Sequence, residues 1–444
     1  MSGSSRDALS GDIVKFVINS NKNTSTKAFL QDKISDIYYY ESVLNETVRA
    51  QVMYIDSGAS VNNKSVIEGL PLVGEEKVEI KIKDANDVEL DLTLYVNSVK
   101  PLTQDVQKSV ISVDLVSKED ILNHQKRVNV RFDGKISDHV TRILTDQNFL
   151  NCQKTLDIEQ TENNYNFIGN NRKPFYLLTW LSKYGIPSVP NARGKTAGFF
   201  FYETSQGYKF KSIDKLLEQT PVRKILFNDM QDAGGERIPP GYDTKALELT
   251  TDSTINVQSK RESGAYSTRL ILFDPFNCVY EIIKPRSEEN VSGMKLAGSE
   301  LPTFNREFNQ GASDNFTRTT YMLVDKGTLP TGNTQQQIEE KAKEINFDPK
   351  NVLNQSTMRY NQLFTITKTV LIAGDFSLHA GDTVELHEPE VASEKDTKDT
   401  SREFGGIYMI ADLCHYMTRT STYTKLNLVR DSYGSRSQTN YRAL

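Results

Sequence analysis

The sequence has few cysteines and histidines and no long apolar run. Its three cysteines, Cys152, Cys278 and Cys414, are odd in number and far apart, so they predict reduced thiols and exclude a disulfide framework. No segment approaches the roughly 20 consecutive apolar residues that a membrane-spanning helix needs. Residues 1–10 are rich in serine and lack the apolar core of a signal peptide. We therefore expect a protein that is cytosolic where it is synthesised and does not insert into a membrane.

The sequence also lacks the motifs of common enzyme classes and metal sites. It contains no G-x-S-x-G, no phosphate-binding loop, no dinucleotide fingerprint and no H-E-x-x-H. Cys414 is followed directly by His415, but zinc sites use spaced pairs such as C-x₂₋₄-C or H-x₃₋₅-H, and none is present. We expect ordinary imidazoles, without a metal or another cofactor, at all five histidines: His124, His139, His379, His387 and His415.

Paired carboxylates are the remaining candidates for catalysis, because wall hydrolases use two of them. The candidate pairs are Glu203 with Asp214 and Glu41 with Asp56. The sequence holds 58 acidic residues, however, so pairs are common, and a catalytic acid also needs an apolar setting that raises its pKa. We expect no enzymatic activity. The alternative, a wall hydrolase, predicts clearing of peptidoglycan that is lost on Glu203→Gln.

What the sequence does contain indicates a multidomain, mainly β protein. At 444 residues it is too long for one hydrophobic core, so about two to four domains are expected. The 20 Tyr and 20 Phe favour strands, where broad side chains pack on a pleated surface. A net charge of −5, with bases mixed among acids, argues against a protein that grips nucleic acid by its phosphates. It leaves open a channel through which DNA passes.

One sequence pattern occurs twice. A turn glycine, an acid and a strand with alternating apolar residues occupy residues 72–80, with Gly74, and residues 378–386, with Gly381. A second strand follows each copy, at residues 113–116 and 426–429. The two spacings differ by the length of a short insertion, which loops tolerate because closure entropy grows only with the logarithm of length. The pattern predicts one barrel built twice; chance similarity between two hairpins is the alternative.

The predicted fold class is α+β, mainly β, with two similar antiparallel β-barrel domains and two smaller inserted α/β domains. Alternating residues such as Val78, Ile80 and Ile82 predict strands with one buried face. Residues 388–403 form a charged segment that is most often a solvated loop. The predicted boundaries are 1–123 for the first barrel, 124–223 for an α/β domain, 224–293 with 361–434 for the second barrel, 294–360 for a small inserted domain, and 435–444 for a flexible tail.

Local signals predict elements inside the two smaller domains. Apolar residues at helical spacing predict a helix over 136–144, and Pro174 at the start and Gly185 past the end bound a second one. Residues 335–345 and 349–360 predict two short helices. An aromatic hairpin spans residues 198–210, and its rings at 199–202 are expected in a core. The alternative, a glycan-binding hairpin, predicts binding that is lost on Phe201→Ala without unfolding.

Several motifs spread along the chain carry a resemblance to a known family. They are N-R-K-P-F-x-x-L-x-W-L from residue 171, F-Y-E-T from 201 with G-x-x-F-x-S-I-D from 207, A-G-D-x-x-L-x-A-G-D-x-V from 373, and L-V-R-D from 428. In order and spacing the sequence resembles the central baseplate hub proteins of contractile-tailed bacteriophages, of the T-even type and its cyanophage relatives. The motif positions with an expected structural role are Pro174, Phe175, Trp180, Tyr202, Gly207, Gly374, Asp375, Gly381, Asp382, Arg430 and Asp431.

The resemblance implies a function. In this family two homologous tube barrels carry two smaller domains, and three copies form a ring whose six barrels match the six-fold tail tube. The other end receives the central spike, where wall-degrading activity usually resides. The implied partners are the spike, the tail-tube and tube-initiator proteins, the tape-measure protein and baseplate wedge proteins, and DNA passes through the lumen. The implied location is the tail baseplate of the virion. A hub of a bacterial contractile injection system is the alternative.

Overall fold

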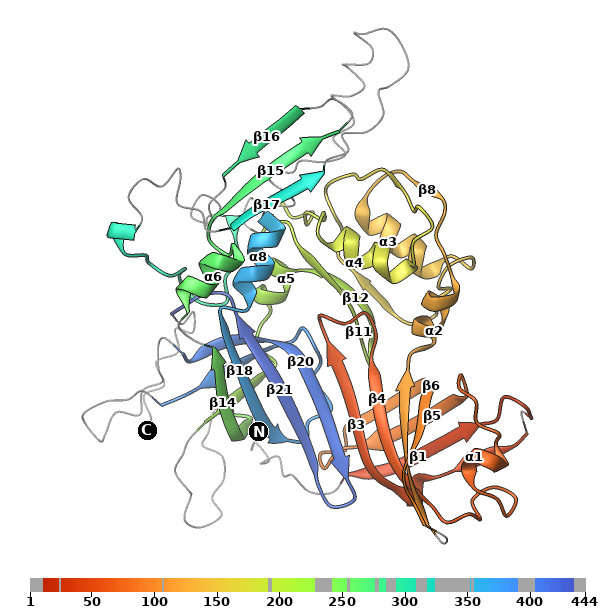
Figure 1. Cartoon of the computed structure of the whole chain (residues 1–444). Helices are drawn as coiled ribbons and strands as arrows, with labels where there is room; N and C mark the ends of the chain where they lie inside the picture. Colours follow the sequence, from red (N-terminus) through yellow and green to blue (C-terminus); the bar gives the residue numbers. More distant parts are fainter. Residues whose placement is uncertain are drawn as a thin grey trace.

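The structure is a computed structural model of the chain (Figure 1). It describes residues 11–23, 25–105, 108–190, 194–227, 242–253, 256–275, 279–284, 293–308, 318–323, 352, 355–389 and 404–434. In Figure 1 most of the long strands lie side by side in the lower half, and most of the helices and the smaller sheets lie above them. The fold is mainly β, as predicted.

The N-terminal strands pair only in antiparallel fashion. They are β1 (Asp12–Asn19), β2 (Lys27–Phe29), β3 (Ile34–Ser42), β4 (Arg49–Asp56), β5 (Lys77–Lys83), β6 (Glu89–Gln104) and β7 (Ser109–Val116), with the short helices η1 (Gln31–Lys33) and α1 (Val66–Gly69) between them. Their order is β2-β1-β5-β6-β7-β4-β3. The predicted alternation holds on β5, where Val78, Ile80 and Ile82 enter the core and Glu79 and Lys81 between them do not.

The C-terminal strands close into a six-stranded barrel. They are β13 (Arg223–Leu226), β14 (Thr244–Ser253), β18 (Ile366–Ala373), β19 (Thr383–His387), β20 (Gly406–Thr418) and β21 (Thr422–Arg430). Their order is β19-β13-β14-β18-β21-β20, and β20 pairs again with β19. Ile225, Val370, Val384, Tyr408 and Leu426 are among the side chains that fill this barrel.

The two strand groups form one continuous sheet. β20 of the C-terminal group pairs antiparallel with β3 of the N-terminal group, from Asp412 opposite Ser42 to Thr418 opposite Asp36. The result is a 13-stranded sheet. Tyr38 and Tyr416 stack across this junction with their ring centroids 4.6 Å apart. A single sheet therefore runs through both halves of the chain.

The segment between the two strand groups forms an α/β layer. It contains α2 (Lys118–Gln125), β8 (Arg131–Phe132), α3 (Ile136–Thr145), β9 (Leu156–Ile158), β10 (Phe167–Ile168), α4 (Pro174–Ser182), β11 (Phe199–Thr204), β12 (Gly207–Ser212) and α5 (Ile213–Glu218). Pro174 starts α4, where a missing N–H costs nothing. The helices predicted near residues 136 and 174 and the aromatic hairpin are confirmed.

A second insertion lies between β14 and β18. It contains α6 (Val257–Ser263), β15 (Thr268–Asp274), β16 (Val279–Ile283), η4 (Arg306–Phe308), β17 (Arg318–Leu323) and α8 (Gln355–Leu363). Residues 268–283 were predicted to belong to the second barrel. That placement is wrong, because β14 pairs directly with β18, and β15 and β16 form a separate sheet with β17.

Of the other predicted segments, one helix is observed with shifted bounds and the rest lie wholly or mostly outside the described residues. The helix predicted at residues 349–360 begins at Gln355 and runs to Leu363. The helix predicted at 335–345, most of the charged segment 388–403 and the tail 435–444 lie outside the described residues.

Candidate functional site

Glu41 lies where both strand groups meet the α/β layer. It is on β3 and 1% exposed. Its Oε1 accepts a hydrogen bond from the N–H of Ser205 in the β11–β12 turn at 2.7 Å, and its Oε2 accepts one from the N–H of Ala380 before β19 at 3.0 Å. His379 Nδ1 lies 3.5 Å from Oε1. This carboxylate therefore joins three segments that are distant in sequence.

The surroundings of Glu41 and His379 shift both of their pKa values. Burial alone would raise the pKa of Glu41, but His379 and the two backbone N–H groups outweigh it and hold that pKa below its ordinary value. Burial opposes charge on His379 as well, yet Glu41 and Asp382 raise its pKa above 6.5, while Lys209 acts against them. The pair is therefore stabilised in its charged form.

The His379–Glu41 pair predicts a pH-dependent stability. The folded-state pKa of His379 is raised, so its contribution is complete below the unfolded value and is lost as pH rises through the folded value. We expect His379→Gln to lower the melting temperature more at about pH 5.5 than at about pH 8.5. Differential scanning calorimetry measures this, with the exposed His124→Gln as control. An equal loss at both pH values would contradict the expectation.

Glu203 binds groups of the protein through both of its carboxylate oxygens. It is 2% exposed at the end of β11, and Lys154 Nζ donates to its Oε1 at 2.6 Å. Its Oε2 accepts from Ser117 Oγ and, at 3.1 Å, from the N–H of Val48. Burial raises the pKa of Glu203, although Lys154 opposes the shift. A pocket of about 300 Å³ borders this residue and the exposed Asp91, but the contacts give Glu203 a structural task between β4 and the α/β layer.

Asp214 belongs to a buried cluster around Arg359. The guanidinium of Arg359 is fully buried and donates to Asp431 Oδ2 at 2.8 Å, Asp214 Oδ1 at 3.2 Å and the carbonyl oxygen of Lys295 at 2.8 Å. Asp431 also accepts from the N–H of Ala297 at 2.9 Å. The cluster thus connects α5, α8 and the end of β21. Arg359 and Lys154 were missed in the sequence, because nothing local marks a cation whose partners lie far along the chain.

Asp56, the proposed partner of Glu41, organises its own loop. Its Oδ1 accepts from the N–H of Gly58 at 3.0 Å and from Ser60 Oγ at 2.7 Å, and its Oδ2 accepts from the N–H of Val66 at 2.6 Å. All four carboxylates considered for catalysis are therefore held by donors of this chain. No hydrogen bond or ion pair among the described residues joins two of the four.

Four motif positions stabilise the α/β layer. Phe175 is buried and its N–H donates to Asn123 Oδ1 at 2.9 Å. Trp180 contacts an aromatic cluster that includes Phe167, while Pro174 starts α4. Gly207 has φ +125°, and a Cβ there would lie 2.2 Å from the carbonyl oxygen of Thr155. These residues pack and turn the chain.

Further motif positions lie where the α/β layer meets the C-terminal barrel. Gly381 has φ +86°, and a Cβ there would lie 2.1 Å from the hydroxyl oxygen of Tyr202. Asp382 Oδ2 accepts from the N–H of His379 at 2.9 Å in the same turn. Tyr202 is 1% exposed, so the close approach is inside the protein.

The remaining motif positions hold the strands of the C-terminal barrel. Asp375 Oδ2 accepts from Arg223 Nε at 3.0 Å and so connects the turn after β18 to β13. The buried Arg430 donates to the carbonyl oxygen of Gly405 at 2.8 Å. A Cβ at Gly374 would lie 2.7 Å from Thr422. All of these contacts are structural.

The histidines contact other groups of the protein. His139 Nε2 lies 2.8 Å from the carbonyl oxygen of Tyr165, and burial lowers the pKa of His415 to about 4. In the part of the chain that the structure describes, no three His, Cys, Asp or Glu side chains are grouped to hold a metal ion. Within that part, no helix has the length and apolar character needed to cross a membrane. The other histidines contact charged neighbours. His124 contacts Lys173, His379 contacts Glu41, and His387 contacts Glu385.

The aromatic hairpin is part of the interior. Phe199, Phe200, Phe201 and Tyr202 are at most 6% exposed. Alternate residues face two different clusters. Phe199 and Phe201 pack in the core of the α/β layer, whereas Phe200 and Tyr202 pack at the contact with the C-terminal barrel. These rings are thus core residues, as predicted, and the hairpin offers no exposed ring on which a sugar could stack.

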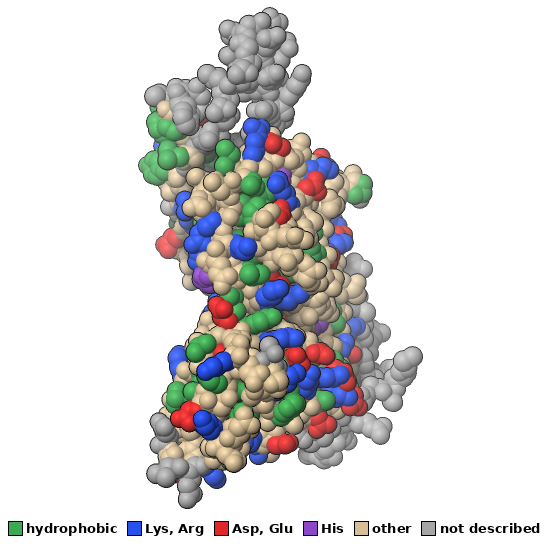
Figure 2. Space-filling model, turned by 90° about the vertical axis from the view of Figure 1, so that its right-hand side faces the viewer, with side chains coloured by type: hydrophobic (Ala, Val, Ile, Leu, Met, Phe, Trp, Pro, Cys, Tyr) green, Lys and Arg blue, Asp and Glu red, His purple; other side chains and the backbone are tan. Residues whose placement is uncertain are grey.

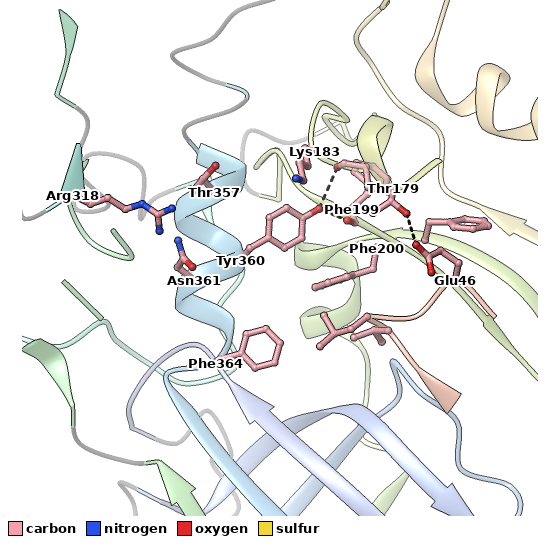
Figure 3. Close-up of a pocket in the computed structure, with 14 residues that line it drawn as sticks. Glu46, Thr179, Lys183, Phe199, Phe200, Arg318, Thr357, Tyr360, Asn361 and Phe364 are labelled. Carbon is pink, nitrogen blue, oxygen red and sulfur yellow. Dashed lines mark hydrogen bonds between the residues drawn. The ribbon is translucent and has the colours of Figure 1, made fainter. Parts of the chain in front are cut away.

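A pocket of about 460 Å³ opens beside this hairpin (Figure 3). It lies among the β3–β4 turn, α4, β11 and α8, with Phe200, Tyr360 and Phe364 on its wall. Among its described lining residues the one acid is Glu46, which accepts from Thr179 Oγ1 at 3.1 Å. Two-carboxylate hydrolysis therefore has no second acid here.

The face of the molecule shown in Figure 2 carries charges of both signs. On the face shown in Figure 2, Lys and Arg side chains alternate with Asp and Glu. On β5 and β6, Lys81 and Lys83 contact Glu89 at 2.7 and 2.8 Å and lower the pKa of this carboxyl to about 2. A surface of this kind is not the single-sign basic patch that phosphate binding needs.

Comparison with known proteins identifies the fold. No family model and no curated protein sequence matches the chain. The 43 kDa tail protein of prophage MuSo2 from Shewanella oneidensis is similar in structure, with a TM-score of 0.51, 10% identity, and coverage of 94% of this chain and 98% of that chain. A tail protein from Neisseria meningitidis MC58 gives a TM-score of 0.51 and 10% identity over 95% of this chain and 97% of that chain. The chain shares, nearly end to end, the fold of two tail proteins.

Proposed function

We propose that this chain is a structural hub of a phage tail baseplate, without enzymatic activity, and that three copies form a ring with six barrel lobes. The observation that carries the proposal is a repeated strand order in the two halves of the chain. The shared fold with two tail proteins supports the tail setting. The carboxylates of Glu41, Glu203 and Asp214 accept hydrogen bonds from other parts of the chain, which supports a structural role for them.

The repeat is visible in the order of the strands. The N-terminal group contains the order β1-β5-β6-β7-β4-β3, and the C-terminal group contains β13-β19-β20-β21-β18-β14. With the short β2 and the separate sheet β15–β17 left out, each member corresponds to a strand at the same rank along its half. The halves differ at their first strand in closure and in direction: β13 pairs parallel with both β14 and β19, so the C-terminal barrel is not wholly antiparallel as predicted, whereas β1 pairs antiparallel with β5 and β2 in the described residues. This order supports a duplicated barrel.

Two irregularities recur at corresponding places. The β3–β4 ladder shifts register at Ser35 and the β14–β18 ladder at Leu247. The β6–β7 ladder shifts after Val96 and the β20–β21 ladder after Ile410. Bulges are conserved within families of sheets, although a second shift in the β6–β7 ladder after Pro101 and one in the β14–β18 ladder after Thr251 have no counterpart in the other half. The two shared shifts support a common origin for the two halves.

The hydrogen bonds of the two repeated turns align them one residue away from the alignment predicted from the sequence. The N–H of Glu75 donates to the carbonyl oxygen of Val96 at 2.7 Å, and the N–H of Gly381 donates to that of Ile410 at 2.8 Å. Glu75, with φ +65°, therefore corresponds to Gly381, and the corresponding residue is not Gly74. The paired apolar residues on the following strands are unaffected.

The continuous sheet supplies a wall for a channel. Its strands β14-β18-β21-β20-β3-β4-β7-β6 are neighbours without a break. We assign their face away from the barrel cores to the lumen, because acids outnumber bases on it and DNA phosphates would pass without being held. Its polar side chains include Asp36, Arg49, Gln51, Lys100, Asp114, Glu248, Thr250, Asp252, Asp412, Lys425 and Asn427.

We assign the parts of the chain to different partners. The two tube barrels face the tail-tube and tube-initiator proteins. They comprise residues 1–123 and residues 224–293 with 361–434, without the separate sheet of β15, β16 and β17. The α/β domain 124–223 and the insertion before residue 361 lie together at one end of the long strands, so we assign the spike to that end (Figure 1). Tape-measure protein and DNA occupy the channel, and wedge proteins surround the ring. The protein is located in the virion tail.

Electron microscopy and light scattering test the ring. We expect purified protein, alone or with its spike, to scatter as a trimer, and class averages down the symmetry axis to show three chains and six lobes. Two similar barrels per chain are needed, because one per chain would offer only three equivalent contacts to a six-fold tube. A stable monomer that does not bind the spike would exclude the hub assignment.

A further inference from the structure

The pocket beside the aromatic hairpin has a floor of fixed aromatic rings (Figure 3). Phe200 of β11 and Tyr360 of α8 meet edge to face, with their ring centroids 5.2 Å apart. The hydroxyl of Tyr360 donates to the carbonyl oxygens of Phe199 and, at 3.4 Å, of Ser182, so both ends of this side chain are held. Rings that are already fixed lose little conformational freedom when something binds on them, which favours binding.

Apolar side chains also reach the mouth of this pocket. Leu44, in the turn between β3 and β4, is 54% exposed, and Phe364, directly after α8, is partly exposed. The pocket volume of about 460 Å³ is within the range of known ligand sites. An apolar group that enters the pocket is stabilised in proportion to the apolar area that it removes from water. The shape and the walls therefore suit a large apolar side chain.

The rim of the pocket carries more positive than negative charge. Lys183, directly after α4, is exposed, and no hydrogen bond or ion pair of its ammonium group occurs within the described residues. Arg318 is exposed as well and donates to a neutral acceptor, the carbonyl oxygen of Ser263, at 2.6 Å. Glu46 lies on the opposite side of the pocket from Arg318 in Figure 3, and its carboxylate already accepts from Thr179. An anionic group beside Lys183 is therefore complementary to this rim.

We propose that the pocket receives an aromatic side chain of a partner protein, and that an acidic residue next to it in the partner sequence pairs with Lys183. Aromatic side chains that fill a pocket ringed by polar groups carry much of the binding energy of protein contacts. The backbone of such a partner would also cover Leu44, which a small molecule inside the pocket would leave exposed. The site does not depend on the proposed ring, because all of its described walls belong to one chain.

Saturation-transfer NMR on the purified chain tests the site. The probes are two tetrapeptides with blocked ends, Gly-Asp-Phe-Gly and Gly-Asn-Phe-Gly, which have nearly the same shape and differ in charge. We expect saturation transfer to the phenylalanine ring of both peptides. The dissociation constant should be about two- to fivefold lower for the aspartate peptide, because one exposed ion pair is added to the same apolar contact.

Variants of exposed residues separate the two parts of the contact without disturbing the core. Lys183→Gln should abolish the preference for the aspartate peptide, and Lys183→Glu should transfer the preference to Gly-Lys-Phe-Gly. Leu44→Ser should weaken both original peptides alike, by about threefold or more, because it removes apolar area from the mouth. The control is Lys22→Gln, since Lys22 is an exposed lysine that does not line the pocket, and it should change neither dissociation constant.

Each alternative outcome overturns a stated part of the proposal. Absence of saturation transfer from both peptides at millimolar concentration would overturn the site. Equal binding of the two peptides, or a preference that survives Lys183→Gln, would overturn the pairing with Lys183. Tighter binding of free N-acetylphenylalanine than of the aspartate peptide would assign the pocket to a small molecule and overturn the docking of a partner. Light scattering tests the ring separately, so a failure of the pocket leaves the hub intact.

Discussion

Replacing Arg359 by methionine is expected to lower the free energy of unfolding by about 3–5 kcal/mol, because it leaves two buried carboxylates without their cation. Asp214 and Asp431 are 2% and 0% exposed, and Arg359 is itself fully buried. Arg359→Lys should recover little, since a compact ammonium cannot reproduce the forked contacts to both acids. The cluster joins α5, α8 and the end of β21, so its loss should also loosen the contact between the layers.

Denaturant unfolding followed by circular dichroism measures the Arg359 effect. The matched control is Arg131→Met, because the side chain of Arg131 is 69% exposed and pairs with Asp133 at 2.9 Å on the surface. An exposed pair of this kind contributes about 1 kcal/mol or less. Combining Arg359→Met with asparagine at both acids should recover part of the loss. Similar losses for Arg359→Met and Arg131→Met would show that the buried cluster is not a stabilising unit.

Gly381→Ala is expected to destabilise the protein by about 2–4 kcal/mol, through backbone strain and overpacking. The backbone at Gly381 has φ +86°, which a side chain disfavours, and the new methyl would lie 2.1 Å from the hydroxyl oxygen of Tyr202. Tyr202 is buried at the contact between the α/β layer and the C-terminal barrel. The two causes predict separable effects.

Two further variants separate strain from overpacking at Gly381. Gly58→Ala is the control, because Gly58 has φ +78° and nothing within 4 Å of a Cβ, so it measures the backbone cost alone. Tyr202→Phe removes the hydroxyl oxygen and should recover part of the loss in a double-mutant cycle. Calorimetric melting temperatures report all four proteins. If Gly58→Ala and Gly381→Ala cost the same, the close approach to Tyr202 carries no energy.

Local elements were predictable because their signals lie within a few residues. Pro174 marks the start of α4, and alternation at Val78, Ile80 and Ile82 marks β5. Burial of the hairpin rings also follows from local pattern. The strand at residues 268–274 was recognised as a strand but assigned to the wrong sheet, because alternation identifies a strand without identifying its neighbour.

The acids of the candidate site could be predicted from the sequence, but their hydrogen-bond donors could not. Glu41 and Glu203 were singled out as acids, but their donors at Ala380 and Lys154 lie far away in the sequence. Whether such an acid is catalytic or structural depends on which donors contact its carboxylate oxygens, and those donors are brought there by the packing of the whole chain.

The mainly β character, the turns and helix ends, and the recurrence of one strand pattern could be predicted, since each depends on residue types at short spacing. The pairing of β3 with β20, the order that six strands share in both halves, and the contacts of Arg359 with Asp214 and Asp431 could be seen only in the folded chain. These contacts join residues tens to hundreds of positions apart. They form because burial of apolar faces brings the strands together, and burial is a property of the whole fold.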